Sequence, residues 1–197
     1  MKCENMVAEI SRNTLETQIK MTAQLDESNR GLKGVSGIGF FDHMLNSFAI
    51  HAGLKVELQM KGDLNVDCHH TIEDVGICLG KLLWQIAQQN KPNNRYGLSY
   101  IPMDEALARS VIDISGRPFI IVNYIPKTPM IGDFDTQMVA EFFRAVAFNM
   151  NSTLHLEVLY FQNDHHAVEA LFKAFSHSFR QAVETVGGCE ISAKGIL

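Results

Sequence analysis

His69-His70-Thr71-Ile72-Glu73 and His165-His166-Ala167-Val168-Glu169 are two copies of one motif, His-His-x-x-Glu, about a hundred residues apart. On a helix, residues four apart share a face, so the first histidine and the glutamate of each copy converge. The second histidine lies roughly 100° further round the helix axis and points elsewhere. Each copy can therefore contribute ligands to two different metal ions.

The segments around the two motifs resemble each other. In each, a helix and then an alternating strand precede the motif helix. We expect helices at about 40–52, 69–89, 135–149 and 165–186, and strands at about 7–12, 17–25, 54–60, 107–114, 119–122 and 154–160. The turn-rich stretch Lys91-Pro92-Asn93-Asn94 separates the halves. We predict an α+β fold built by internal duplication, with halves 1–92 and 93–197 that each pack a β-sheet on helices and together form one catalytic unit.

Composition limits the functional classes. The chain has 197 residues, of which 46% are hydrophobic, and a net charge of -5. Nucleic-acid binding needs clustered lysine and arginine, so we expect no nucleic-acid partner. No apolar run is long enough to span a bilayer, and the N-terminal residues show no secretory signal. The four cysteines lack paired spacing, which favours a reducing cytoplasm.

Histidine and glutamate are the predicted metal ligands. A lone histidine is usually an ordinary polar residue, but adjacent pairs with glutamate at i+4 that occur twice favour coordination. Two further histidines, one on the strand before the second motif and one at the start of a helix, complete an even set. The predicted ligands are His43, His69, His70, Glu73, His155, His165, His166 and Glu169. Such mixed imidazole and carboxylate ligands suit Mn, Fe, Co, Ni or Zn, and four ligands per octahedral ion leave open positions for catalysis.

Motifs along nearly the whole chain resemble the imidazoleglycerol-phosphate dehydratases. The two metal motifs carry the resemblance together with seven further segments. These are Arg12-Asn13-Thr14-Leu15-Glu16-Thr17, Gly37-Ile38-Gly39-Phe40-Phe41-Asp42-His43-Met44-Leu45, Arg95-Tyr96-Gly97, Pro102-Met103-Asp104-Glu105-Ala106, Asp113-Ile114-Ser115-Gly116-Arg117-Pro118 and Glu141-Phe142-Phe143, with Leu154-His155 before the second motif. Their order and spacing, rather than any one of them, make the resemblance specific.

The resemblance implies a fold, a reaction and an assembly. The fold would be of the ribosomal protein S5 domain 2-like type. The reaction would convert imidazole-glycerol phosphate to imidazole-acetol phosphate and water in histidine biosynthesis. Metal bound to the substrate ring would stabilise an imidazolate, which expels the adjacent hydroxyl through a diazafulvene-like intermediate. The resemblance also implies two Mn²⁺ ions per subunit and a homo-24-mer with shared active sites.

The resemblance also assigns roles to residues. We expect one metal site of His70, His155, His165 and Glu169, and another of His43, His69, Glu73 and His166. In this division the second histidine of each motif serves the site of the other motif, and this assignment of His70 and His166 stays open. Catalytic roles are expected for Glu16, an acid/base candidate, and for Glu73, Glu169, His70 and His166. Expected substrate contacts are Glu16, His43, His51, His69, His70 and Glu73, with Arg95, Arg117, Lys173, Ser192 and Lys194 at the phosphate.

The sequence departs from the family in its last residues. The family commonly has Pro-Ser-Thr-Lys-Gly where this chain has Ile191-Ser192-Ala193-Lys194-Gly195. The loss of the threonine removes one hydroxyl contact. Two other functional classes stay open from the residues alone: a non-catalytic shell assembled by metal, and a dinuclear metallohydrolase, which usually needs a bridging carboxylate.

Overall fold

Each half of the chain forms a four-stranded sheet with two helices. The computed structural model describes residues 7–187 of the 197. The first half contains β1 (Ala8–Asn13), β2 (Thr17–Leu25), β3 (Gly31–Lys33), α1 (Gly39–Ala52), β4 (Leu54–Gly62) and α2 (His69–Gln89). The second contains β5 (Tyr96–Met103), β6 (Ala106–Asp113), β7 (Phe119–Asn123), α3 (Met138–Asn149), β10 (Thr153–Tyr160) and α4 (Asp164–Val183), with the small hairpin β8 (Met130–Ile131) and β9 (Phe134–Asp135) before α3.

The two sheets have the same topology. Their strand orders are β1-β2-β4-β3 and β5-β6-β10-β7. In each sheet a hairpin leads to an antiparallel third strand, and a parallel strand completes the edge. The parallel strand is joined to its neighbour through a helix, as parallel pairing requires. The predicted α+β fold with two similar halves is confirmed.

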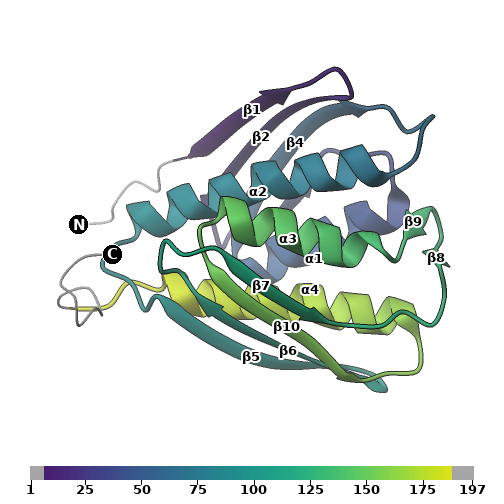
Figure 1. Cartoon of the computed structure of the whole chain (residues 1–197). Coiled ribbons are helices and arrows are strands. Elements are labelled where there is room, and N and C mark those ends of the chain that lie inside the picture. Colours follow the sequence, from purple (N-terminus) through teal and green to yellow (C-terminus); the bar gives the residue numbers. More distant parts are fainter. Residues whose placement is uncertain (1–6, 188–197) are drawn as a thin grey trace.

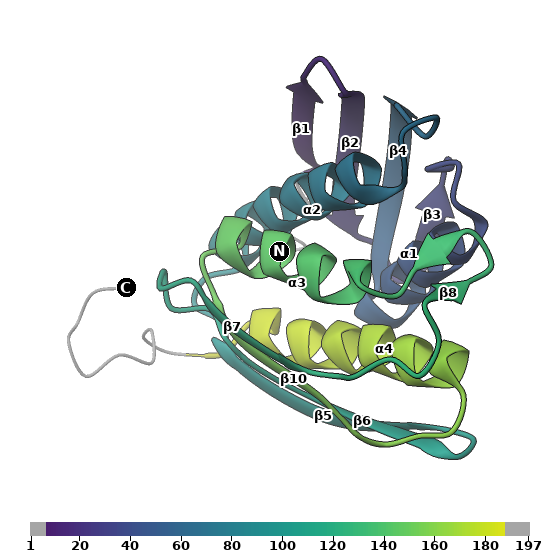
Figure 2. The ribbon, with the colours of Figure 1, turned by 45° about the vertical axis from the view of Figure 1, so that its right-hand side comes forward.

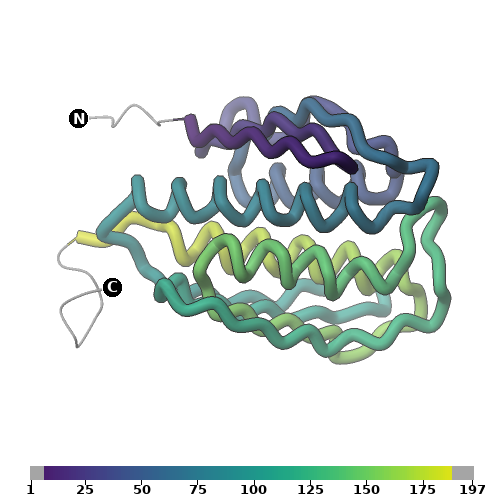
Figure 3. The backbone as a smooth tube through the Cα atoms, turned by 45° about the horizontal axis from the view of Figure 1, so that its top comes forward, coloured from purple at the N-terminus to yellow at the C-terminus, as the bar shows by residue number. Residues whose placement is uncertain are grey.

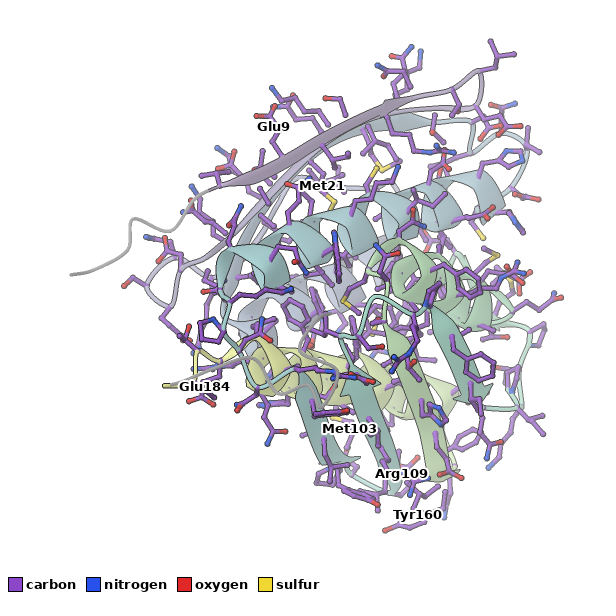
Figure 4. All side chains as sticks on the ribbon, turned by 60° about the vertical axis from the view of Figure 1, so that its left-hand side comes forward. Glu9, Met21, Met103, Arg109, Tyr160 and Glu184 are labelled. Carbon is purple, nitrogen blue, oxygen red and sulfur yellow. The ribbon has the colours of Figure 1, made fainter. Side chains whose placement is uncertain are left out.

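The four helices lie between the two sheets (Figures 1 and 2). Alternation along β2 and β4 directs their apolar side chains toward the helices. Met21 on β2 is buried, whereas Glu9 on β1 faces outward, and Figure 4 shows the two on opposite sides of the sheet. Because both inner faces are covered by helices, one continuous core serves both halves.

The helices pair across the halves. Helix α1 packs on α4, and α2 packs on α3, which run side by side in Figures 1 and 3. Phe175 of α4 links the two pairs: its ring stacks on Phe48 of α1 with centroids 5.2 Å apart and meets Phe143 of α3 edge-on at 5.6 Å. The halves therefore share one hydrophobic core and do not form separate domains.

Two helix boundaries differ from the sequence expectation. Helix α3 begins at Met138 and not near Asp135, because the β9 strand occupies 134–135. Helix α4 ends at Val183, since the following residues pair with the Pro92–Asn94 segment, as in the bond from Val186 N–H to the Pro92 carbonyl. Strands β3, β5, β8 and β9 were not predicted. None of the helices in residues 7–187 combines the length and hydropathy needed to cross a membrane.

Glycine lets α2 approach α3 closely. A Cβ added at Gly80 would lie 2.5 Å from the Val146 carbonyl oxygen, and one at Gly76 would lie 3.0 Å from that of Phe142. Real Cβ atoms do not tolerate the first of these contacts with a backbone atom. Both glycines therefore lower the intrinsic stability of the helix but allow the close contact between α2 and α3.

We predict that Gly80→Ala destabilises the protein, although alanine is the better helix former by about 1 kcal/mol. The added methyl must push the two helices apart, and overpacking costs typically 1–3 kcal/mol. Thermal and urea unfolding measure the loss. Gln89→Ala at the exposed end of the same helix is the control and should change stability little. A more stable Gly80→Ala protein would contradict the close contact.

Candidate metal and substrate site

Three predicted metal ligands converge at the seam between α1 and α4. His43 comes from α1, and His165 and Glu169 come from the first turns of α4. One nitrogen or oxygen of each lies within 4.8 Å of the others. The distances to the Glu169 carboxylate are 3.3 Å from His165 Nε2 and 3.6 Å from His43 Nε2. Two imidazoles and a carboxylate at these separations can close around one divalent cation.

Glu169 is the buried member of this cluster. Its side chain is 9% exposed, and its carboxylate forms a 2.7 Å ion pair with Lys173. Burial alone would raise the pKa of Glu169, but Lys173 and the two neighbouring histidines outweigh burial and lower that pKa. The group is therefore anionic at neutral pH, as a metal ligand must be.

The first motif repeats the helical pairing. His69 Nε2 lies 3.4 Å from Glu73 Oε2 across one turn of α2. Both i,i+4 pairs therefore have the geometry expected from the sequence. In place of a histidine like His43, the neighbouring α3 offers Glu141, which lines a pocket together with His69.

The second histidine of each motif is held by a carboxylate outside the motif. His70 Nδ1 lies 2.9 Å from Asp63, and His166 Nδ1 lies 2.7 Å from Glu105. These contacts raise the pKa of both histidines, and the bond with His166 does most to lower the pKa of Glu105, to about 2. Neither carboxylate was predicted as a site residue, although Glu105 lies in a segment that carried the family resemblance.

The opposite nitrogen of each of these histidines faces a hairpin. His70 Nε2 lies 3.6 Å from Glu16 on the β1–β2 turn, and His166 Nε2 lies 3.8 Å from Asp104 on the β5–β6 turn. The two turns occupy equivalent places in the duplicated halves. Glu16 is therefore close to a predicted metal ligand, as its expected acid/base role requires.

One chain does not show the predicted division of the ligands. His43 lies with His165 and Glu169 and not with His69 and Glu73, because α1 packs on α4. Nor does His155 join His165: its neighbours Leu154 and Leu156 are buried, so its own side chain projects from the outer face of the sheet, away from α4. Among residues 7–187, the His43 group is the one set of three such ligands that converges.

The expected phosphate contacts separate into two groups. Asp113, at the end of β6, accepts two hydrogen bonds from Arg95 at 2.6 and 3.1 Å and lies 3.6 Å from Arg117. Arg95 has a φ of 64°, a strained value for a residue other than glycine.

Lys173 belongs to the second group of expected phosphate contacts. It lies beside Glu169 and contacts the Met103 sulfur at the opposite end of the sheet from Asp113. Ser192 and Lys194 lie outside the described residues.

His51, an expected substrate contact, lies two turns beyond His43 on α1. Its ring centroid is 5.2 Å from that of His177 on α4. Burial is the main cause that lowers the pKa of both imidazoles. The α1–α4 seam therefore carries histidines at both ends, with the metal-type cluster at one end only.

Comparison with known proteins gives consistent matches. The family model described as imidazoleglycerol-phosphate dehydratase matches residues 36–179. The imidazoleglycerol-phosphate dehydratase of Bacillus thuringiensis (strain Al Hakam) is 50% identical over 173 residues, which cover 88% of this chain and 89% of that protein. The crystal structure of the Staphylococcus aureus enzyme superposes with a TM-score of 0.83 at 40% identity and covers 92% of this chain and all of that one. The enzyme of Pyrococcus furiosus, solved with (S)-C348, gives 0.81 at 30% identity, with 95% of this chain and all of that chain covered.

Removing a ligand of the α1–α4 cluster should reduce metal binding. We predict that Glu169→Gln and His165→Ala each weaken Mn²⁺ binding by more than about tenfold, since the loss of a supporting contact alone costs 10–100-fold. Metal content after dialysis measures this effect. Glu57→Gln, which changes a half-exposed carboxylate paired with Lys55, is the control. Full metal content in both cluster variants would contradict the ligand assignment.

Proposed function

The chain belongs to the imidazoleglycerol-phosphate dehydratase family, and we propose that its active site is completed by a neighbouring copy of the chain. The activity is the dehydration of imidazoleglycerol phosphate, a step of histidine biosynthesis. The enzyme is therefore a hydro-lyase. The family predicted from the sequence motifs is confirmed, and the metallohydrolase alternative is wrong.

We propose that the converging His43, His165 and Glu169 hold a divalent cation, and this cluster is the observation that carries the proposal. Imidazole and carboxylate ligands without thiolate suit Mn²⁺, which the resemblance also implies, with two ions per subunit. The residues fit such an ion, because their ligand atoms converge and Glu169 is ionised although buried. A bound ion would supply Lewis acidity toward the imidazole ring of the substrate.

The chain's own groups then have distinct tasks. Glu73 and Glu169 bring negative charge to the two metal sites that we propose. The histidine ligands of these sites fix the position at which the substrate ring is held. Glu16 projects from the β1–β2 turn beside His70, and its side chain is 53% exposed. A carboxylate there can reach a bound substrate, so we assign to Glu16 the transfer of the substrate proton.

The phosphate-binding residues support a shared site. In one chain, Arg95 and Arg117 lie at the Asp113 end of β6, whereas Lys173 lies at the hairpin end. The eight residues of β6 separate these ends by about 24 Å. A small phosphate ester cannot bridge that distance. The arginines of one chain therefore serve the metal cluster of another.

The outer face of the second sheet supports the same proposal. Cross-strand register places Leu98, Val111, His155 and Ile121 in one row on this face. The apolar members of the row are exposed, as are Tyr96, Tyr100 and Phe119 around it. A contiguous apolar patch of this kind marks an interface. A second copy that covers it would receive His155 as a ligand, and the resemblance gives the assembly its proposed 24 subunits.

The outer face of the first sheet differs. It carries charged pairs such as Lys20 with Glu9 at 2.9 Å and Lys55 with Glu57 at 3.1 Å. The outer face of the second sheet is thus apolar and that of the first sheet is charged, so subunit contacts should use the second half.

We further propose a cytoplasmic location, because the cysteines show no paired spacing.

Arg117→Ala should weaken substrate binding and leave metal content unchanged. Loss of one charge-assisted contact to phosphate costs roughly 1.5–3 kcal/mol, or about 10- to 150-fold in kcat/KM. Steady-state kinetics with imidazoleglycerol phosphate measure the effect. Lys20→Ala removes a surface cation from the first sheet and is the control. Unchanged kinetics in Arg117→Ala would show that this arginine does not bind the phosphate.

Metal removal should abolish activity and change the assembly together. Chelation empties sites that we assign partly to neighbouring chains, so the particle should become smaller, and added Mn²⁺ should restore both size and turnover. Light scattering and the dehydratase assay follow the two properties, with generic phosphate esters as control substrates. A metal-free protein that keeps its full size would contradict metal-dependent assembly, and one that keeps full turnover would contradict the metal proposal.

A further inference from the structure

Both halves place a carboxylate on Nδ1 of the motif's second histidine. Asp63 Oδ2 lies 2.9 Å from His70 Nδ1, and Glu105 Oε2 lies 2.7 Å from His166 Nδ1. In each case the Nε2 atom is the nitrogen that remains for another partner. The same contact therefore accompanies both copies of the motif.

The two carboxylates come from places that the duplication does not relate. Asp63 follows β4 in the connection to α2, whereas Glu105 lies on the β5–β6 turn. The turn equivalent to that of Glu105 is β1–β2, where Glu16 approaches the opposite nitrogen, Nε2, of His70. Copying one half onto the other would not generate both Nδ1 contacts. Each half thus reaches the same arrangement by its own route, which indicates that the arrangement itself is required.

An ionised carboxylate can only accept hydrogen bonds, so it requires the proton of the ring on Nδ1. This tautomer leaves Nε2 with a free lone pair, the form in which imidazole binds a metal ion. The contact also fixes the rotation of the ring about its side-chain bonds. Supporting carboxylates of this kind raise the basicity of a metal-binding histidine.

Glu105 is itself held in place. Its Oε1 atom accepts hydrogen bonds from the backbone N–H groups of Gln162 at 3.1 Å and Asn163 at 2.7 Å, in the turn before α4. Its other oxygen, Oε2, is left to accept from His166. Asp63 differs, because its second oxygen, Oδ1, is buried without a hydrogen-bond partner among the described residues.

We propose that Asp63 and Glu105 are positioning residues that set the tautomer and orientation of His70 and His166, so that both Nε2 atoms can bind divalent cations. This inference rests on the proposed role of the two histidines as metal ligands. It adds two residues that act through those ligands and do not touch the substrate.

The difference between the two carboxylates makes the test specific. In Glu105→Gln, the two backbone N–H groups hold the amide oxygen, so the amide N–H₂ faces His166 Nδ1. That donor favours the tautomer with the proton on Nε2, in which Nε2 has no free lone pair for a metal ion. We expect Mn²⁺ affinity to fall 10–100-fold. In Asp63→Asn the amide can turn its oxygen toward His70, so the loss should be smaller, whereas Asp63→Ala should match Glu105→Gln.

Two measurements separate positioning from a general structural effect. Competition with a metallochromic chelator gives the affinity for Mn²⁺, and ¹⁵N NMR of labelled histidines in the metal-free protein at a pH where imidazole is neutral gives the tautomer. Thermal unfolding verifies the fold, and Glu9→Gln is a matched exposed carboxylate. We expect the His166 signals of Glu105→Gln to report the proton on Nε2, with no such change in Glu9→Gln.

The outcomes distinguish this inference from the proposed function. If the parent protein binds no Mn²⁺, the metal proposal fails and the positioning role fails with it. If the parent binds Mn²⁺ and the folded Glu105→Gln protein binds it equally tightly with an unchanged tautomer, only the positioning role is overturned. Weaker binding without a change of tautomer would also overturn it, since Glu105 would then act through the shape of the turn alone.

Discussion

The packing of α1 on α4 is the contact on which the candidate site depends. Stacking of Phe48 on Phe175 fixes the two helices against each other, and the same seam then brings His43 to His165 and Glu169. The first ligand belongs to one half of the chain and the other two belong to the second half. Neither half alone can form this cluster, so the shared core is a requirement of the site as well as of stability.

Duplication explains the framework but not the chemistry. Strand order, helix order and the His-His-x-x-Glu motif repeat, yet the partners that the motif meets do not. One motif helix faces His43 and the other lies near Glu141; one Nδ1 contact comes from a loop and the other from a hairpin. Two copies of one fold have thus diverged where side chains from separate elements meet, while the pattern within each helix is unchanged.

The sequence likewise predicted the patterns within one helix but not the contacts between separate elements. Helical spacing alone anticipated the pairs His69 with Glu73 and His165 with Glu169, because both members lie on one element. The approach of His43 to His165 and Glu169 was not anticipated, since it depends on which helices pack together, and no local pattern encodes that choice. The outward direction of His155 could have been inferred, because Leu154 and Leu156 on either side are apolar and strand residues alternate. The partners Asp63 and Glu105 carry no spacing signal, and β5 lacks a strong alternating pattern.

The separation of Arg117 from Glu169 along one chain has a genetic consequence. If the arginine of one subunit serves the cluster of another, a chain defective at the phosphate end and a chain defective at the metal end carry their lesions in different halves of each site. Mixed in one particle, the two inactive chains would place an intact arginine opposite an intact cluster at some of the interfaces. Two alleles that are null separately could then support growth together, and a damaged chain could equally impair an intact neighbour.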